Sequence, residues 1–196
     1  YSHMSDMSTL PIFQLEDVAY HEGNPGHHMQ ISIQQELSGI PRFRTQYRTT
    51  AYTEGWGLYA EWLAKEMGAF EDPYSDFGRL SGELWRAIRL VVDTGIHAQH
   101  WGEERAVQYF IDNSAQALGA IRSEIQRYIT APGQATAYKI GMMKFQELRG
   151  NAESALENNF DIRAFHDAVL GAGALPMPML ESRVSSWVEE VQLSLK

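Results

Sequence analysis

Residues 74–100 read YSDFGRLSGELWRAIRLVVDTGIHAQH, and they carry the clearest structural signal in the chain. Apolar side chains recur in this stretch at three- and four-residue steps, which is the period of an amphipathic α-helix. The apolar set comprises Phe77, Leu80, Leu84, Ile88, Val91 and Gly95. We therefore expect a helix over residues 74–100 that buries this set on one face.

The opposite face of this expected helix is polar. It carries Arg86, Arg89, Asp93, His97 and His100, again at steps of three and four. A solvated surface is the simpler interpretation, because polar helix faces are mostly exposed. Lys and Glu dominate most such faces, however, whereas this one is made of Arg, Asp and His. We interpret it as one wall of a polar cleft.

The helical period extends over most of the chain, and no sustained alternation of apolar and polar residues indicates a strand. Gly or Pro interrupts the pattern at 23–26, 39–41, 71–73, 131–133, 150–151 and 171–178. Helices are expected at 27–38, 51–69, 74–100, 102–117, 119–130, 134–149, 152–158, 161–170 and 178–194. The predicted fold class is all-α, with one continuous domain over residues 5–196 after a cloning remnant at 1–4, which includes His3.

Composition limits the classes of function. The chain has 196 residues, and its 16 basic and 25 acidic side chains give a formal net charge of −9. This balance, with no block of Lys or Arg, disfavours nucleic acid as a partner. The absence of cysteine excludes disulfides, thiolate zinc sites and cysteine nucleophiles. No apolar run approaches the ~20 residues of a membrane-spanning helix, and the compartment is not fixed by the sequence.

Residues 20–30, YHEGNPGHHMQ, gather three of the seven histidines together with a glutamate. A catalytic zinc ion takes three protein ligands, commonly two His and a carboxylate, and works beside a further carboxylate that accepts a proton from water. His21 and His27 are therefore candidate ligands and Glu22 is a candidate general base. His28 is the alternative to His27.

The spacing departs from the usual zinc-peptidase motif, in which three residues separate the two histidines. Pro25 occupies the fourth position after His21. In a straight helix, residues six apart lie about 9 Å apart along the axis, too far for one ion. Because Pro25 and Gly26 disfavour such a helix, we expect a looped segment that folds His21 back toward a helix starting near His27. The alternative is a Gly/Pro turn with exposed histidines.

A second cluster, YTEGWGLYAE, covers residues 52–61. Glu54 falls in the first turn of an expected helix, where it is either the third ligand or a partner of the helix dipole. Glu61, seven residues later, shares its face. The glycines on either side of Trp56 are poor helix formers and indicate close approach of another element, such as the segment that bears the histidines.

Taken together, the motifs of this chain resemble a bacterial family, domain of unknown function 885. The resemblance rests on residues 20–30 and 52–61, on the run from Arg89 to His97, and on three shorter motifs: Arg127-Tyr128, Pro132-Gly-Gln134 and Tyr138-Lys-Ile-Gly141. That family is grouped with the gluzincin metallopeptidases, which are mostly helical and similar to angiotensin-converting enzyme, thimet oligopeptidase and carboxypeptidase Taq. The resemblance implies that this chain is the C-terminal part of a longer protein, whose N-terminal region completes the cleft.

The resemblance also implies roles for individual residues. His21, His27 and Glu54 would be the zinc ligands, and Glu22 would be the general base. Related enzymes stabilise the oxyanion with a later His and Tyr, and here His97 and Tyr138 lie in motifs that can supply them. Arg89 and Arg127 can hold a substrate carboxylate, although an ion pair between Arg89 and Asp93 is an equal alternative. His166 is interpreted as a packing or surface residue.

The function expected from the sequence is that of a zinc-dependent hydrolase, most simply a peptidase acting on peptides. Two alternatives stay open. One is a metal-dependent hydrolase of a non-peptide amide. The other is a helical binding domain, or an inactive relative whose metal site has decayed.

Overall fold

The computed structural model describes residues 11–195, and within that range the fold is all-α with no strand, as the sequence predicts. The expected cloning remnant at residues 1–4, with His3, lies outside the described residues. The helices are α1 (Leu15–Glu22), α2 (His27–Glu36), α3 (Thr50–Glu66), α4 (Pro73–Gln99), α5 (Glu103–Asn113), α6 (Leu118–Thr130), α7 (Ala137–Leu156), α8 (Ile162–Leu170) and α9 (Met177–Ser194). Short 3-10 turns occur at η2 (Ile12–Gln14), η3 (Arg42–Thr45) and η4 (Glu157–Asn159).

Most helix ends fall where Gly or Pro interrupts the apolar pattern. Helix α4 begins at Pro73, and the Asp72 side chain accepts a hydrogen bond from the backbone N–H of Tyr74 at 3.0 Å, which is a standard N-cap. The break expected at 150–151 is wrong, because α7 continues through Gly150. A glycine inside a helix costs only about 1 kcal/mol, and Leu148, Ala152 and Leu156 hold that part of α7 in the core.

The predicted burial of α4 is wrong for most of its apolar residues. Ile88 and Gly95 are buried as expected, but Phe77, Leu80 and Leu84 are 52%, 51% and 48% exposed. Val91 is 38% exposed. The polar residues Arg89 and Asp93 are buried instead (6% and 3% exposed), because each finds hydrogen-bond partners on neighbouring elements.

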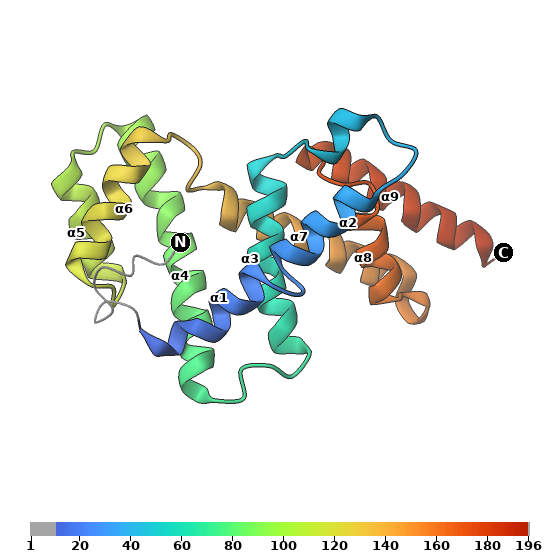
Figure 1. Ribbon diagram of the computed structural model, residues 1–196, viewed down its shortest axis with the longest axis horizontal. Coiled ribbons are helices and arrows are strands. Elements are labelled where there is room, and N and C mark those ends of the chain that lie inside the picture. Colours follow the sequence, from blue (N-terminus) through green and yellow to red (C-terminus); the bar gives the residue numbers. More distant parts are fainter. Residues whose placement is uncertain (1–10, 196) are drawn as a thin grey trace.

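Two hydrophobic cores lie at the two ends of the molecule. Figure 1 shows α5 and α6 at one end, α8 and α9 at the other, and α1 and α3 between them. The larger core joins α3, α7, α8 and α9 around Trp56, Phe145 and Phe165. The smaller one joins α4, α5 and α6 around Phe110 and Ile125.

Among residues 11–195, helices α3 and α7 make the most extensive contact between two helices. They touch where Gly55 faces Gly141, and a Cβ on Gly55 would overlap the Gly141 backbone. This contact places the first turns of α3 beside α7, while α1, α2 and α4 pack around the same part of α3. Five helices therefore converge on one region. Among the helices of residues 11–195, none combines the length and the apolar character required to cross a membrane.

Candidate metal centre

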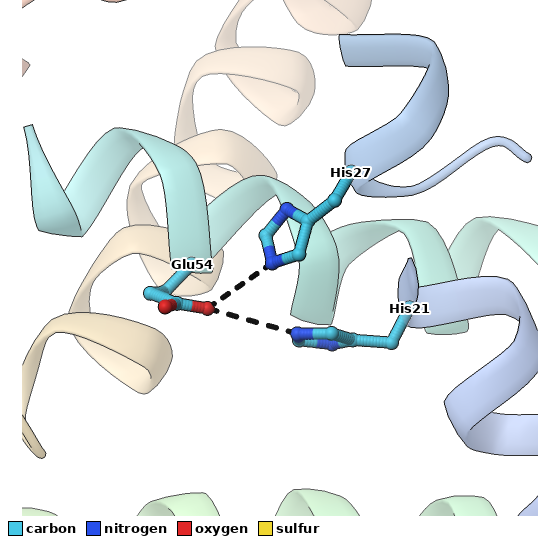
Figure 2. A group of neighbouring side chains, drawn as sticks. All are labelled: His21, His27 and Glu54. Carbon is cyan, nitrogen blue, oxygen red and sulfur yellow. Dashed lines mark hydrogen bonds and ion pairs between the residues drawn. The ribbon is translucent and has the colours of Figure 1, made fainter. Parts of the chain in front are cut away.

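His21, His27 and Glu54, the three candidate ligands, lie close together on three different helices. The helix that carries His21 was not expected from the sequence. His21 lies near the end of α1, His27 begins α2, and Glu54 lies in the second turn of α3. Glu54 Oε2 is 3.2 Å from His27 Nε2 and 3.7 Å from His21 Nε2. Figure 2 shows both imidazole rings directed at this one carboxylate.

The turn at residues 23–26 explains how two histidines six residues apart meet. Helix α1 ends at Glu22 and α2 starts at His27, so the expected looped segment is confirmed. Trp56 on α3 anchors this turn, because its Nε1–H donates a hydrogen bond of 2.8 Å to the Pro25 carbonyl. His28, the alternative ligand, is exposed and lies outside the group.

Gly57 on α3 provides the space that the His21 ring occupies. A Cβ at this position would lie 2.7 Å from His21 Cε1 and 2.9 Å from Nε2, closer than van der Waals contact permits. The imidazole therefore lies against bare backbone of α3. Of the two glycines beside Trp56, Gly57 therefore permits the close approach of the helix that carries His21, whereas Gly55 permits that of α7.

The donor set fits a zinc ion. Two imidazole nitrogens and a carboxylate oxygen are its usual ligands in catalytic sites, and bonds of about 2.0–2.2 Å place tetrahedral ligand atoms roughly 3.3–3.6 Å apart. The two distances to Glu54 bracket that range, and all three ligand atoms lie within 4.8 Å of one another. Each histidine also bonds through Nδ1, to Glu61 and Gln30 respectively, which leaves each Nε2 directed at Glu54.

Behind His21 lies a buried charged network of Glu61, Asp17 and Arg86. His21 Nδ1–H donates to Glu61 Oε1 at 2.6 Å, and Arg86 Nη2 lies 3.6 Å from the same oxygen. Glu61 and Asp17 are each 1% exposed. The sequence placed Glu61 on the face of Glu54 and Arg86 on the wall of a polar cleft, but it gave Asp17 no part in this site. Asp17 precedes His21 by one helical turn, a spacing that could have indicated it.

This environment shifts several pKa values. Burial alone would lower the pKa of His21, but hydrogen bonds to Glu54 and Glu61 outweigh it and raise the pKa to about 9. Burial would raise the pKa of Glu54, yet hydrogen bonds from His21 and His27 hold it well below its usual range. Burial, together with the charge of Glu61, raises the pKa of Asp17 to about 9. The site thus favours a carboxylate at Glu54 and a protonated carboxyl at Asp17.

A pocket of about 280 Å³ opens over the His21/His27/Glu54 group. Its remaining lining residues are Val18, Glu22, Arg86, Arg89 and Tyr138. Glu22, predicted as the general base, lines this pocket and is solvent-exposed. Tyr138 comes from α7, and its ring stacks with that of His21 at a centroid distance of 6.4 Å.

Arg89 reaches the pocket from α4, and its guanidinium is already paired with a carboxylate, that of Glu124. Its Nε–H donates to the Tyr128 hydroxyl at 2.8 Å, and its Nη2 donates to Glu124 at 2.8 Å. The guanidinium also lies over the Tyr138 ring, 4.7 Å from its centroid. The alternative ion pair with Asp93 does not form, because the Asp93 carboxylate accepts the backbone N–H of Gly133.

Two other predicted site residues lie outside this pocket. His97 is near the end of α4, and its Nε2–H donates to the backbone carbonyl of Tyr128 at 2.9 Å. Arg127 is exposed on α6 and bonds Gln134 at 3.2 Å. Of the His and Tyr predicted to stabilise an oxyanion, the structure brings only Tyr138 next to the candidate ligands.

His166 is a packing residue, as expected from the sequence. It lies on α8, and the hydroxyl of Tyr59 donates a hydrogen bond of 2.9 Å to its Nε2. Its ring packs edge-on against Trp56. Burial lowers the pKa of His166 to about 4, and the positive charge of Arg149 adds to the effect.

Comparison with known proteins agrees with this architecture. The profile of the family described as "Bacterial protein of unknown function (DUF885)" matches residues 1–184. A crystal structure of "the putative lipoprotein from Colwellia psychrerythraea" is 45% identical over 95% of this chain, with a TM-score of 0.93. A "putative lipoprotein of unknown function from Shewanella oneidensis" is 24% identical over 94%, with a TM-score of 0.79, and shares the fold. This chain spans 32% of the length of each of these two proteins. None of the curated proteins matches it.

Proposed function

The chain belongs to the bacterial family DUF885, and we propose that it carries the catalytic centre of a zinc-dependent hydrolase that cleaves peptides. The observation that carries the proposal is the convergence of His21, His27 and Glu54 within 4.8 Å of one another, with Glu22 on the same pocket. The similarity to gluzincin metallopeptidases that the sequence motifs imply supports the same assignment.

His21, His27 and Glu54 would hold the ion through two Nε2 atoms and a carboxylate oxygen. When bound, zinc would supply Lewis-acid polarisation of a carbonyl group and would lower the pKa of a water molecule. The protein's own part is to hold the ligand side chains in position. Glu61 does so for His21 and Gln30 for His27, each through the Nδ1 atom of the histidine.

Glu22 is the proposed general base. In this role its carboxylate would accept a proton from the attacking water and then donate it to the leaving amine, so that Glu22 ends the reaction as the carboxylate with which it began. Its place on α1 next to His21, at a solvent-exposed position on the pocket, suits both transfers. A general base must be unprotonated before the reaction, so this role requires Glu22 as a carboxylate.

Tyr138 is the proposed hydrogen-bond donor to the oxyanion. Its hydroxyl accepts a hydrogen bond from Gln134 Nε2 at 3.3 Å and keeps its own proton to donate. Removal of a single oxyanion donor typically costs about 10²–10³ in rate. His97, whose Nε2–H is used by the Tyr128 carbonyl, is the weaker candidate. Arg86 and Arg89 line the pocket and are the candidate partners of a substrate carboxylate. Arg89 is already paired with Glu124 and Arg86 lies 3.6 Å from Glu61, so either would have to share its charge with the substrate.

The test is Glu22→Gln in zinc-loaded protein, assayed by mass spectrometry on a peptide library together with a panel of non-peptide amides. We expect peptide cleavage by the wild type and a loss of about 10²–10⁴-fold in the variant, with an unchanged zinc content. Glu147→Gln, at a site 51% exposed on α7, is the matched control. Full activity in Glu22→Gln would overturn the assignment of the base, and cleavage of amides alone would overturn the peptide substrate.

A further inference from the structure

Helix α4 presents a line of apolar side chains to solvent, here called the α4 seam and made of Tyr74, Phe77, Leu80, Leu84 and Val91. Phe77, Leu84 and Val91 repeat every seven residues, and Leu80 lies between the first two. Positions 74 to 91 span about 26 Å of helix. Single exposed apolar residues need no explanation, but four within three helical turns, with Val91 two turns further along the same face, indicate a surface that another element covers.

The seam continues at one end into an apolar hollow of about 380 Å³ lined by Phe13, Pro73, Tyr74 and Phe77. Rings of Phe13 and Phe77 pack there at a centroid distance of 5.6 Å. The hollow carries almost no polar surface, which suits an apolar side chain and offers nothing to a charged one.

The spacing of the seam indicates what kind of element covers it. A seven-residue repeat with a further apolar residue three or four positions on is the pattern with which one helix packs along another, with side chains of each inserted between those of its partner. An amphipathic helix lying nearly parallel or antiparallel to α4 would bury all five side chains. A strand or a flat loop has no matching period.

The lengths of the two similar proteins of known structure indicate where such a helix comes from. Each matches nearly the whole of this chain, 95% and 94%, yet the matched part is 32% of its own length. About two-thirds of each longer protein is therefore additional polypeptide. We propose that the α4 seam is the packing surface for a helix in the additional polypeptide of the full-length protein.

A second copy of this chain is the weaker occupant. At roughly half of the 150–250 Å² that a large apolar side chain can bury, the five side chains offer on the order of 500 Å². A symmetric pair would bury about 1,000 Å² in total, less than the ~1,200–2,000 Å² of stable interfaces. A helix on the same polypeptide does not lose translational freedom when it packs, so the same area suffices. This inference does not depend on the proposed hydrolysis.

These 196 residues contain no cysteine, so a thiol introduced here is unique in this part of the protein and its labelling can be followed by peptide mass spectrometry. Leu80→Cys places a thiol on the seam, and Ser123→Cys places one at an exposed position of α6 as the control. Each is introduced into the 196-residue chain and into the full-length gene product, and native-state labelling by a maleimide is timed. We expect the seam thiol to label quickly in the 196-residue chain. In the longer protein its labelling rate should be about one-tenth of that value or lower. The control should label quickly in the 196-residue chain.

A double variant separates the possible occupants. Leu80→Glu with Leu84→Glu should change Tm of the 196-residue chain by no more than about 2 °C, because both positions are exposed, and should lower Tm of the longer protein by about 4 °C or more. Equal labelling of the seam in both proteins would overturn the proposal, as would a gene product no longer than this chain. A dimer of the 196-residue chain that the double variant dissociates would also overturn it, in favour of a second copy.

Discussion

His21 Nδ1 lies 2.6 Å from Glu61 Oε1, in a contact that joins α1 to α3 across 40 residues of sequence. The ring is thereby fixed with its other nitrogen toward Glu54, 3.7 Å away. A carboxylate that receives the second N–H of a ligand histidine both orients the ring and makes its free nitrogen more basic. Glu61 therefore belongs to the candidate metal centre even though it faces away from the pocket.

Replacing Glu61 by Gln should weaken zinc binding. The amide keeps the shape of the side chain but loses the charge that holds the His21 ring, and loss of such a partner typically lowers metal affinity 10–100-fold. Competition with a fluorescent zinc chelator measures the change. Glu147→Gln, which lies far from the ligands in sequence and is 51% exposed, should bind zinc as the wild type does. Equal affinities in all three proteins would contradict this role of Glu61.

Adding one methyl group at Gly57 should displace the His21 ring. Because the new Cβ would lie 2.7 Å from His21 Cε1, Gly57→Ala should lower the free energy of unfolding by about 1–3 kcal/mol and weaken zinc binding. Gly150→Ala is the matched control. It is also within a helix, but nothing lies within 4 Å of its added Cβ, so it should stabilise the protein by about 0.5–1 kcal/mol. Thermal and chemical unfolding measure both changes, and a Gly57→Ala protein as stable as Gly150→Ala would refute the close contact.

Zinc affinity should rise with pH. The pKa of His21 is raised to about 9, so in metal-stripped protein below pH 9 its imidazole is protonated and must lose a proton before it can bind a metal ion. Raising the pH toward 9 removes this competition, and the apparent affinity should increase by up to about tenfold per pH unit. Titration calorimetry at pH 7.5 in buffers of different ionisation enthalpy should record proton release on binding. Affinity that is constant from pH 6.5 to 8.5 would be incompatible with a protonated His21.

His166 should make the protein less stable in mild acid. Burial holds its pKa at about 4, against about 6.5 in an unfolded chain. The stabilising effect of the neutral ring is therefore complete above pH 6.5 and is lost as the pH falls toward 4. The slope is at most about 1.4 kcal/mol per pH unit, and less because the ring is partly solvated.

The measurement for His166 is the free energy of unfolding from urea titrations at several pH values between 4 and 7. The slope should be shallower in His166→Gln than in the wild type, since the amide does not titrate. Identical slopes in the two proteins would show that His166 binds protons equally in the folded and unfolded states.

Most of the helices and their ends could be predicted from the sequence. The helical period of the apolar residues and the Gly or Pro residues that interrupt it are local signals. His21 and His27 could be singled out as candidate ligands because histidine is infrequent in this chain and three of the seven lie in one short motif. The assignment of Glu54 as the third ligand rested on the family resemblance, because an acidic residue in the first turn of a helix is also common. The turn between the two histidines was also predictable, since Pro25 and Gly26 do not permit a straight helix.

The faces of α4 could not be assigned in this way. The period of a helix shows that two faces differ, and the apolar face is ordinarily the buried one. Here Arg89 and Asp93 are buried because Tyr128, Glu124 and Gly133 lie opposite them, and those contacts join residues about 35 to 40 positions apart. The same applies to Arg86, whose place beside Glu61 and His21 depends on how α1 and α4 pack on α3.

The most direct test of the central claim is the zinc content of the purified protein after zinc loading and dialysis, measured by elemental analysis. Wild type is compared with His21→Ala, His27→Ala and Glu54→Ala, and with His28→Ala as the matched control. We expect about one zinc ion per chain in the wild type and in His28→Ala, and almost none in the other three, since each lacks one of three ligands. No bound zinc in the wild type, or zinc retained by all three ligand variants, would contradict the assignment of this site as a metal centre.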